Sequence, residues 1–170
     1  MIKKFTGGLL LVLLTACTDD TTNTQFVLKD NAQIGVSFAN NLSYSDDFNV
    51  YKYRNYYNGG GVAIGDINND GWVDLYFTAN QSENKLYLNQ GDFTFKDITA
   101  TAGVGGARAW STGVAMVDIN ADGFLDIYVC NSGDIAGDKK ENELFINQGD
   151  GTFIDRAEEY NLADKGFSTH

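Results

Sequence analysis

The sequence predicts an all-β protein: a partial β-propeller with about two four-stranded antiparallel blades, an N-terminal leader strand region and the start of a third blade. Three observations predict this fold. A nine-residue phrase occurs twice, short runs of β-forming residues surround each copy, and the chain has no proline and little helical periodicity. Four short strands for each repeat are typical of a propeller blade, which buries its faces only against neighbouring blades.

The repeat is defined by "DINNDGWVD", residues 66–74, and "DINADGFLD", residues 118–126, whose offset is 118 − 66 = 52 residues. The following runs "LYLNQGDFTFKD" and "LFINQGDGTFID" start at residues 86 and 144, an offset of 144 − 86 = 58 residues. The difference of six residues predicts an insertion in the loop "NSGDIAGDKK", because loops tolerate insertions. The chain is therefore predicted to be a repeat protein.

Each repeat contains four runs that predict strands. In the first repeat these are "GVAIG", "VDLYFTA", "KLYLN" and "FTFKDI", and apolar residues alternate with polar ones in the second of them. Gly91 and Asp92, and residues 149–151 in the second repeat, predict the hairpin turn before the last strand. After the N-terminal residues 1–16, only "RAEEYNL", residues 156–162, has a helical pattern.

Composition excludes two classes of protein. With 170 residues, 43% of them hydrophobic, the chain could bury roughly 68–70% of its unfolded surface, so it is not a disordered tail. Its net charge is −11, from 23 acids and 12 bases, and this argues against a nucleic-acid partner. Two bound Ca²⁺ ions would cancel four of these charges and leave −7.

Residues 1–16 are predicted to be a signal peptide. Lys3 and Lys4 precede an apolar run that is too short to span a membrane, and "LTAC" ends at Cys17. This ending resembles the bacterial lipobox, which implies cleavage before Cys17, lipidation of its thiol, and an outer-membrane destination because Thr18 follows. An ordinary signal peptide with an incidental cysteine is the alternative.

The remaining chain divides into five parts. Residues 17–25 are a polar tether, 26–57 a leader with strands that pack on the propeller, 58–109 the first repeat, 110–166 the second, and 167–170 the start of a third repeat. Cys130 is the one further cysteine, so no disulfide framework is expected, and it is predicted to be a small buried apolar residue.

The repeated phrase has the chemistry of a Ca²⁺ loop. Side-chain oxygens stand at positions 1, 3, 5 and 9, a glycine at position 6 permits the turn, and Ca²⁺ accepts six to eight oxygen ligands. A helix-loop-helix calcium site is excluded because it needs a glutamate at position 12, where these loops have Phe77 and Val129. The alternative is that the acids and glycines only form turns.

The phrase resembles the FG-GAP, or VCBS-type, repeat of integrin-like β-propellers, whose loop binds Ca²⁺ between the first two strands of a blade. The resemblance implies two calcium sites, which are expected to be structural because the chain itself saturates them. In each loop the resemblance implies four side-chain ligands and one backbone carbonyl ligand, at position 7. The side-chain ligands are Asp66, Asn68, Asp70 and Asp74 in the first loop and Asp118, Asn120, Asp122 and Asp126 in the second, and the carbonyl ligands are those of Trp72 and Phe124.

The leader also resembles the opening of large bacterial outer-membrane lipoproteins that carry such repeats, often with a C-terminal ASPIC/UnbV-type module. Some members of that group are labelled RNA-binding, which the net charge argues against here. Trp72, Trp110 and the aromatic run of residues 50–58 are expected to pack in the propeller, although a sugar-binding face is the alternative for that run.

Catalysis is not expected in this piece of chain, because its single histidine is His170 and the acids are better explained as metal ligands. The sequence therefore predicts a calcium-binding, surface-anchored module that binds or scaffolds an extracellular protein or glycan, lies on the outer membrane, and binds no nucleic acid. The alternative is the N-terminal part of a polysaccharide-degrading enzyme whose catalytic residues lie downstream of residue 170.

Overall fold

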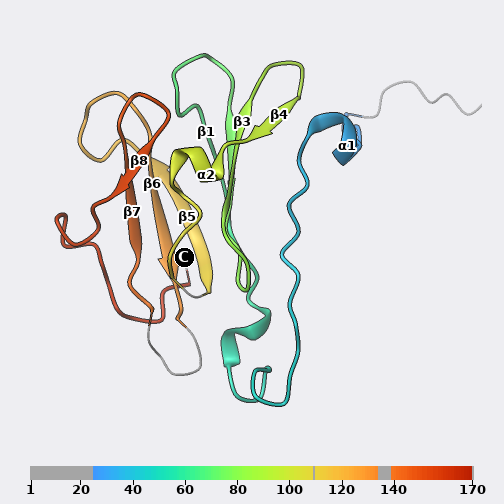
Figure 1. The fold of residues 1–170 in the computed structure, drawn as a ribbon, viewed down its shortest axis with the longest axis vertical. Helices are drawn as coiled ribbons and strands as arrows, with labels where there is room; N and C mark the ends of the chain where they lie inside the picture. The colour runs from blue at the N-terminus through green and yellow to red at the C-terminus, as the bar shows by residue number, and fades with distance from the viewer. Residues whose placement is uncertain (1–24, 109, 134–138, 170) are drawn as a thin grey trace, which may run out of the picture.

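Two four-stranded antiparallel sheets stand beside each other in the computed structural model, which describes residues 25–108, 110–133 and 139–169 (Figure 1). Their strand orders are β1-β2-β3-β4 and β5-β6-β7-β8, so each sheet is a simple up-and-down meander. The predicted all-β fold with two blades of a partial propeller is confirmed. The predicted signal peptide, Cys17, most of the tether and His170 lie outside the described residues.

In blade 1 the strands are shorter than predicted, except for β3, and in both blades they lie in the order that the repeats predict. Blade 1, the first sheet, consists of β1 (Val62–Gly65), β2 (Asp74–Phe77), β3 (Lys85–Asn89) and β4 (Phe95–Asp97). Blade 2 consists of β5 (Ser111–Val117), β6 (Asp126–Asn131), β7 (Glu143–Asn147) and β8 (Phe153–Asp155). The two sheets therefore fall within the predicted repeats 58–109 and 110–166.

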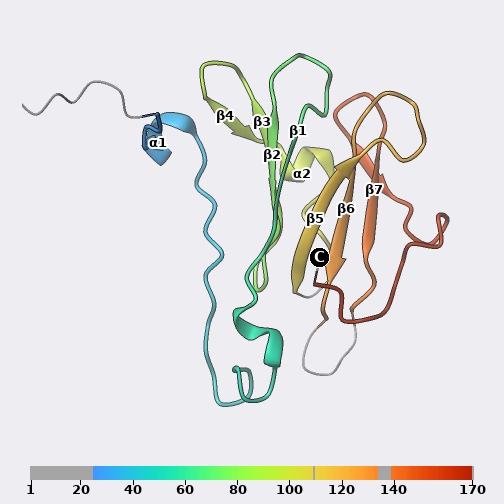
Figure 2. The ribbon, with the colours of Figure 1, turned by 180° about the vertical axis from the view of Figure 1, so that it is seen from behind.

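The main core lies between the two blades, where β1 packs against β5 (Figure 2). Tyr76, Leu86 and Ile127 have no exposed surface in this core. A Cβ atom on Gly65 would lie 2.7 Å from the Leu125 side chain and 2.8 Å from the sulfur of Met116. A larger residue there would force these two core side chains to shift, so the glycine favours the close approach of the blades.

Strand β2 differs from the simple alternation that the sequence predicts. The alternation places Tyr76 on the polar side of the strand, yet Tyr76 is completely buried, and its hydroxyl donates a hydrogen bond of 2.6 Å to the carbonyl of Val104. Burial raises the pKa of this hydroxyl well above its usual range. The expectation of one solvated side was wrong because a blade has neighbours on both faces. A tyrosine can be buried on such a face when its hydroxyl finds a hydrogen-bond acceptor.

Helical structure is limited to three single turns in the described residues, none of which the sequence pattern predicts. These are the α-helices α1 (Asn31–Ile34) and α2 (Thr99–Ala102) and the 3-10 helix η1 (Arg54–Tyr57). The run "RAEEYNL" instead forms consecutive turns. None of these helices is long enough or apolar enough to cross a membrane.

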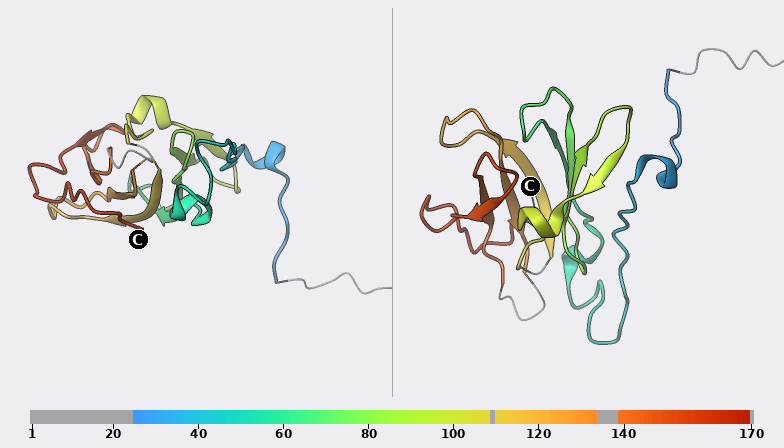
Figure 3. Two further views of the ribbon diagram at one scale, coloured as in Figure 1. Left: turned by 90° about the horizontal axis from the view of Figure 1, so that it is seen from below. Right: turned by 45° about the horizontal axis from the view of Figure 1, so that its top comes forward.

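The leader is predicted to contain strands, and the structure differs: residues 26–57 are irregular apart from the single turns α1 and η1. The leader lies along the side of blade 1 that faces away from blade 2 (Figure 3). Phe38 stacks on Phe77 of β2 with ring centroids 4.9 Å apart, and Asn40 exchanges hydrogen bonds with Asn80. Among the described residues, no neighbouring strand gives the leader a ladder of backbone hydrogen bonds.

Part of the aromatic run of residues 50–58 forms a second cluster with Trp110 at the end of the leader. Tyr53, Tyr56 and Trp110 are buried there, and Phe48 packs against all three rings. These residues have the packing role that the sequence predicts, whereas Tyr51 and Tyr57 of the run are 91% and 67% exposed. Trp72 differs, because half of its surface (51%) is exposed.

Cys130 is a free and buried cysteine on β6, as expected. Burial raises the pKa of its thiol, so the thiolate that reacts with oxidants and metals is disfavoured.

Glu143 is a buried carboxyl that the sequence analysis did not single out. It accepts hydrogen bonds from the backbone N–H of Ala107 and from the amide of Asn131, and 2% of its surface is exposed. Burial raises its pKa; the charge of Asp155 acts in the same direction and that of Arg108 in the opposite one. Glu143 thus fixes the segment that leads into blade 2.

The raised pKa of Glu143 predicts a pH-dependent stability. Between the unfolded pKa and the higher folded pKa the native state holds the extra proton, so this group's contribution falls as pH rises through that window. Glu143→Gln should remove this fall. In chelator, the melting temperature of the variant minus that of the parent should therefore increase by a few degrees from pH 4 to pH 7, since 1 kcal/mol of stability shifts the melting temperature of a chain of this size by about 2–4 °C.

Glu158→Gln is the control, since it removes one carboxylate from an exposed position on the same blade. The interpretation is contradicted if both variants follow the parent's pH profile in parallel.

Candidate functional site

The two repeated loops project from the same end of the blades, between β1 and β2 and between β5 and β6 (Figure 1). In the first loop Asp66 accepts hydrogen bonds from the backbone N–H groups of Asp70 and Gly71, at 3.2 and 2.8 Å. Asn68 accepts from Asp70 as well, and Asp70 accepts from the N–H of Trp72 at 2.8 Å. The predicted side chains at positions 1, 3 and 5 therefore converge on one tight turn.

The second loop repeats this geometry bond for bond. Asp118 accepts from the N–H groups of Asp122 and Gly123, at 3.1 and 2.9 Å, Asn120 accepts from Asp122, and Asp122 accepts from Phe124. The same two backbone positions have positive φ in both loops, namely Asn69 and Gly71 in the first and Ala121 and Gly123 in the second. The two phrases thus specify one loop conformation.

The acids at position 9 are placed differently from the others. Asp74 and Asp126 have no exposed surface, and each accepts two backbone hydrogen bonds, one from position 2 of its own loop and one from the third strand of its blade. For Asp74 these donors are Ile67 and Asn89, at 2.9 and 2.8 Å. For Asp126 they are Ile119 and Asn147, at 3.0 and 2.8 Å.

Asp74 lies close to two other acids of the first loop. Burial raises the pKa of Asp74, two backbone hydrogen bonds oppose this effect, and the neighbouring charges of Asp70 and Asp66 raise the pKa further. Asp70 and Asp66 therefore repel the carboxylate of Asp74, and a bound cation would relieve that repulsion.

The sequence analysis missed two asparagines that brace the loops. Asn89 donates from its amide to the carbonyl of Val73, and Asn147 donates to that of Leu125, at 2.9 and 3.1 Å. Asn147 also donates to the carbonyl of Ile67 in the first loop, across the blade boundary, at 2.8 Å. The repeated "NQG" after each third strand was the signal that could have revealed them.

The two loops also touch directly. The side-chain amide of Asn69 donates to the carbonyl of Gly123 in the second loop at 2.9 Å, and Asn147 of β7 holds Ile67, so the first loop is bonded to blade 2 at two positions. The loops form one connected unit on that end of the molecule.

The loops fit a Ca²⁺ ion in donor chemistry, but not through carboxylates alone. Within the part of the chain that the structure describes, no three Asp, Glu, His or Cys side chains gather closely enough to hold a metal ion. An ion in the first loop would need the amide oxygen of Asn68 and main-chain oxygens such as the carbonyl predicted for Trp72, besides Asp66 and Asp70. Ca²⁺ accepts both kinds of donor, and Asp74 would join as a carboxylate already held by two N–H groups.

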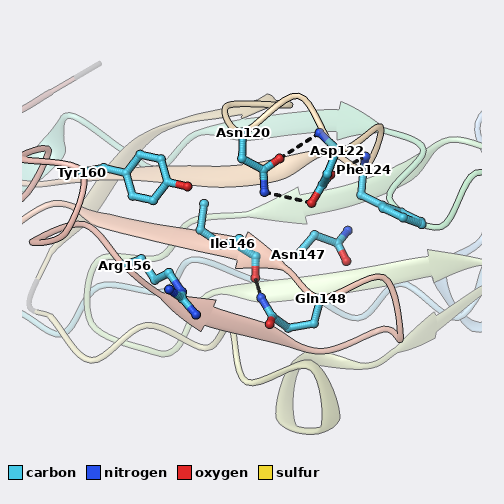
Figure 4. A pocket seen from close by; sticks show the side chains of 8 residues that line it. All are labelled: Asn120, Asp122, Phe124, Ile146, Asn147, Gln148, Arg156 and Tyr160. Carbon is cyan, nitrogen blue, oxygen red and sulfur yellow. Dashed lines mark hydrogen bonds between the residues drawn. The ribbon is translucent and has the colours of Figure 1, made fainter.

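A shallow hollow of about 360 Å³ lies beside the second loop (Figure 4). Polar side chains dominate its wall, and two hydrogen bonds join Asn120 to Asp122 inside it. The lining residues are Asn120, Asp122, Phe124, Ile146, Asn147, Gln148, Arg156 and Tyr160. Arg156 pairs with Glu159 at 2.8 Å, so its charge is already compensated.

Residues 66–129 match the model of the FG-GAP-like repeat, a region that begins with the first loop and ends in β6. This part of the chain is therefore similar to the class of repeat that the two loops indicate.

Part of the chain is similar in sequence to two kinds of animal protein. It is 40% identical over 78 residues to cartilage acidic protein 1 of Xenopus tropicalis and 38% identical over 76 residues to that of Homo sapiens, in each case over 45% of this chain. It is 36% identical over 84 residues to integrin alpha-3 of Mus musculus, over 43% of this chain. The matches span 12% and 8% of the lengths of those relatives.

Proposed function

We propose that this protein is a calcium-stabilised propeller module that binds or scaffolds an extracellular protein or glycan. The observation that carries the proposal is the pair of identical loops, in which oxygens of positions 1, 3 and 5 converge on one turn and the acid at position 9 is fixed by two backbone N–H groups. In the first loop the charges of Asp70 and Asp66 also raise the pKa of Asp74, and a bound cation would relieve this repulsion.

The calcium in this proposal is structural. Each loop wraps its own backbone and braces against the third strand of its blade, and the first loop is also tied to the second blade. Binding an ion there would stabilise the contact between blades, which is the contact on which a repeat fold depends. The ligand-binding surface for the extracellular partner would then be a separate surface that the loops hold in shape.

We further propose that the module is exported and anchored to the outer membrane through lipid on Cys17. The lipobox-like "LTAC" and the polar stretch after it support this localisation. A single acyl chain would attach the protein only weakly to a membrane, whereas the diacyl anchor of a lipoprotein would hold it stably.

Labelling cells with a radioactive fatty acid should mark the parent and leave Cys17→Ser unmarked.

Calcium titration of the chain from Thr18 onward should show about two sites and a higher melting temperature. At 100 times the dissociation constant each independent site would add about 2.7 kcal/mol of stability. The double variant Asp70→Ala, Asp122→Ala should lose both the binding heat and the rise in melting temperature. Calorimetry and thermal melts in calcium and in chelator measure the two effects.

The matched control is Asp46→Ala, Asp47→Ala, which removes the same two charges from exposed leader positions. It should bind calcium like the parent. A folded parent whose melting temperature ignores calcium would show that the loops are only turns, and the proposal would lose its basis.

A further inference from the structure

The start of the leader repeats the end of a blade. Residues 26–30, "FVLKD", match residues 93–97, "FTFKD", which contain β4 of blade 1, with an offset of 93 − 26 = 67 residues. In both places the aspartate is followed by a short helix, a glycine and a valine. This similarity lies outside the two nine-residue loops.

The backbone confirms that the two stretches are built alike. The side chain of Asp30 accepts from the N–H two residues later, at 2.8 Å, as Asp97 does at 2.9 Å and Asp155 of blade 2 at 3.0 Å. Gly35 and Gly103 then end α1 and α2 in the left-handed conformation, with φ of 78° and 76°. Blade 2 has Asn161, with φ of 57°, at the matching position.

The leader also occupies the place that this similarity requires. Gly103, after β4, faces the carbonyl oxygen of Phe153 in the next blade, 3.6 Å from where its Cβ would be. Gly35 faces the carbonyl oxygen of Phe95 in blade 1, and a Cβ there would collide with it. Since 153 − 95 = 58 is the offset between the blades' last strands, Gly35 meets blade 1 where Gly103 meets blade 2.

One apolar residue at the start of the leader lacks the cover that its counterparts have. Leu28 is 99% exposed, whereas Phe95, at the same position in β4, is half-buried and Phe153, at that position in β8, is 6% exposed. On the same side of blade 1, Val62 and Ile64 of β1 are 55% and 63% exposed. Their counterparts in β5, by the offset of 52 residues, are Val114 and Met116, which pack in the core between the blades.

We infer that residues 26–36 are the fourth strand and helical turn of a further blade, which packs on the exposed face of blade 1. The occupant of this face is the set of first three strands from another repeat of the same class, whose third strand pairs with residues 27–30. Strands β1 to β8 cannot supply them, because all eight are used in the two complete blades.

The geometry of blade 1 fixes the expected register. Lys96 of β4 lies opposite Leu88 of β3, so Lys29 should lie opposite the residue that corresponds to Leu88 in the incoming strand. A second contact follows from the tyrosines: Tyr76 donates to the carbonyl of Val104, and Tyr128 donates to that of Leu162. The incoming second strand should bring a tyrosine to the carbonyl of Val36.

Disulfide trapping tests the register directly. The chain from Thr18 onward with Lys29→Cys is mixed, in a thiol-disulfide buffer, with a peptide of residues 58–92, the three strands that precede β4, carrying Leu88→Cys. The mixed disulfide should form in at least tenfold higher yield than with a peptide carrying Leu86→Cys, which is two residues out of register on the same face. The parent chain, whose Cys130 is buried, should not be trapped.

The outcomes separate the possible occupants. Preferential trapping at Leu88→Cys, together with slower amide hydrogen exchange at residues 27–29, supports the further blade. Equal trapping of both peptides, or no trapping while the chain is folded, overturns it. A Lys29→Cys chain that cross-links mainly to a second copy of itself, rather than to the peptide, also overturns it, because the face would then be a contact between copies.

Discussion

Replacing Asp126 with alanine is expected to cost about 2–6 kcal/mol of unfolding free energy, even when calcium is removed by a chelator. The carboxylate is fully buried and accepts hydrogen bonds from the backbone N–H groups of Ile119 and Asn147. Alanine would leave both N–H groups buried without a partner, at about 1–3 kcal/mol each. Urea unfolding followed by circular dichroism, in chelator, measures the loss.

Asp122→Ala in the same loop is the control, and it separates the two roles that the acids have. Asp122 is exposed, and its bonds are local to the turn, so the cost in chelator should be about 1 kcal/mol or less. In saturating calcium, Asp122→Ala should lose the additional stability that the ion supplies. Equal losses for the two variants in chelator would contradict the assignment of Asp126 to the fold itself.

Asp74 and Asp126 have two roles, as predicted metal ligands and as buried acceptors of backbone hydrogen bonds, and only the first could be predicted from the sequence. The loops, the strand order and the hairpin turns follow from patterns within nine or ten residues, and local turn chemistry specifies them. The position 9 acids were predicted only as ligands, because their second hydrogen-bond donors, Asn89 and Asn147, come from a different strand. Such long-range partners are fixed by the sheet register, which the local pattern does not contain.

The leader was mispredicted for a related reason. Its first residues have the composition of a strand, and the sequence therefore predicted strands, but a strand forms only when a neighbour supplies the backbone hydrogen bonds. Residues 26–30 have no such neighbour in the described part of the chain and remain irregular. The similarity between "FVLKD" and "FTFKD" is too short to identify a blade end by itself. It gains meaning from the matching contacts of Gly35 and Gly103 with consecutive blades.

Trp110→Ala is expected to have the second large effect, about 3–5 kcal/mol, because it empties the centre of the leader's aromatic cluster. The Trp110 ring is 2% exposed, and its centroid lies 5.0 Å from those of Phe48 and Tyr53 and 5.5 Å from that of Tyr56. Its indole N–H donates to the carbonyl of Asn55 at 3.3 Å, so the substitution also leaves a carbonyl of η1 without this donor.

The other tryptophan provides the matched control. Trp72→Ala removes the same side chain from a position that is 51% exposed, where the ring lies mainly against Gly91, and should cost about 1 kcal/mol or less. Each variant keeps one tryptophan, so intrinsic fluorescence during urea unfolding reports on both. Because Trp110 joins the leader to the start of blade 2, its loss should also speed amide hydrogen exchange in residues 48–57 more than in β2 and β6. Equal costs for the two substitutions would mean that the aromatic cluster does not hold the leader to the blades.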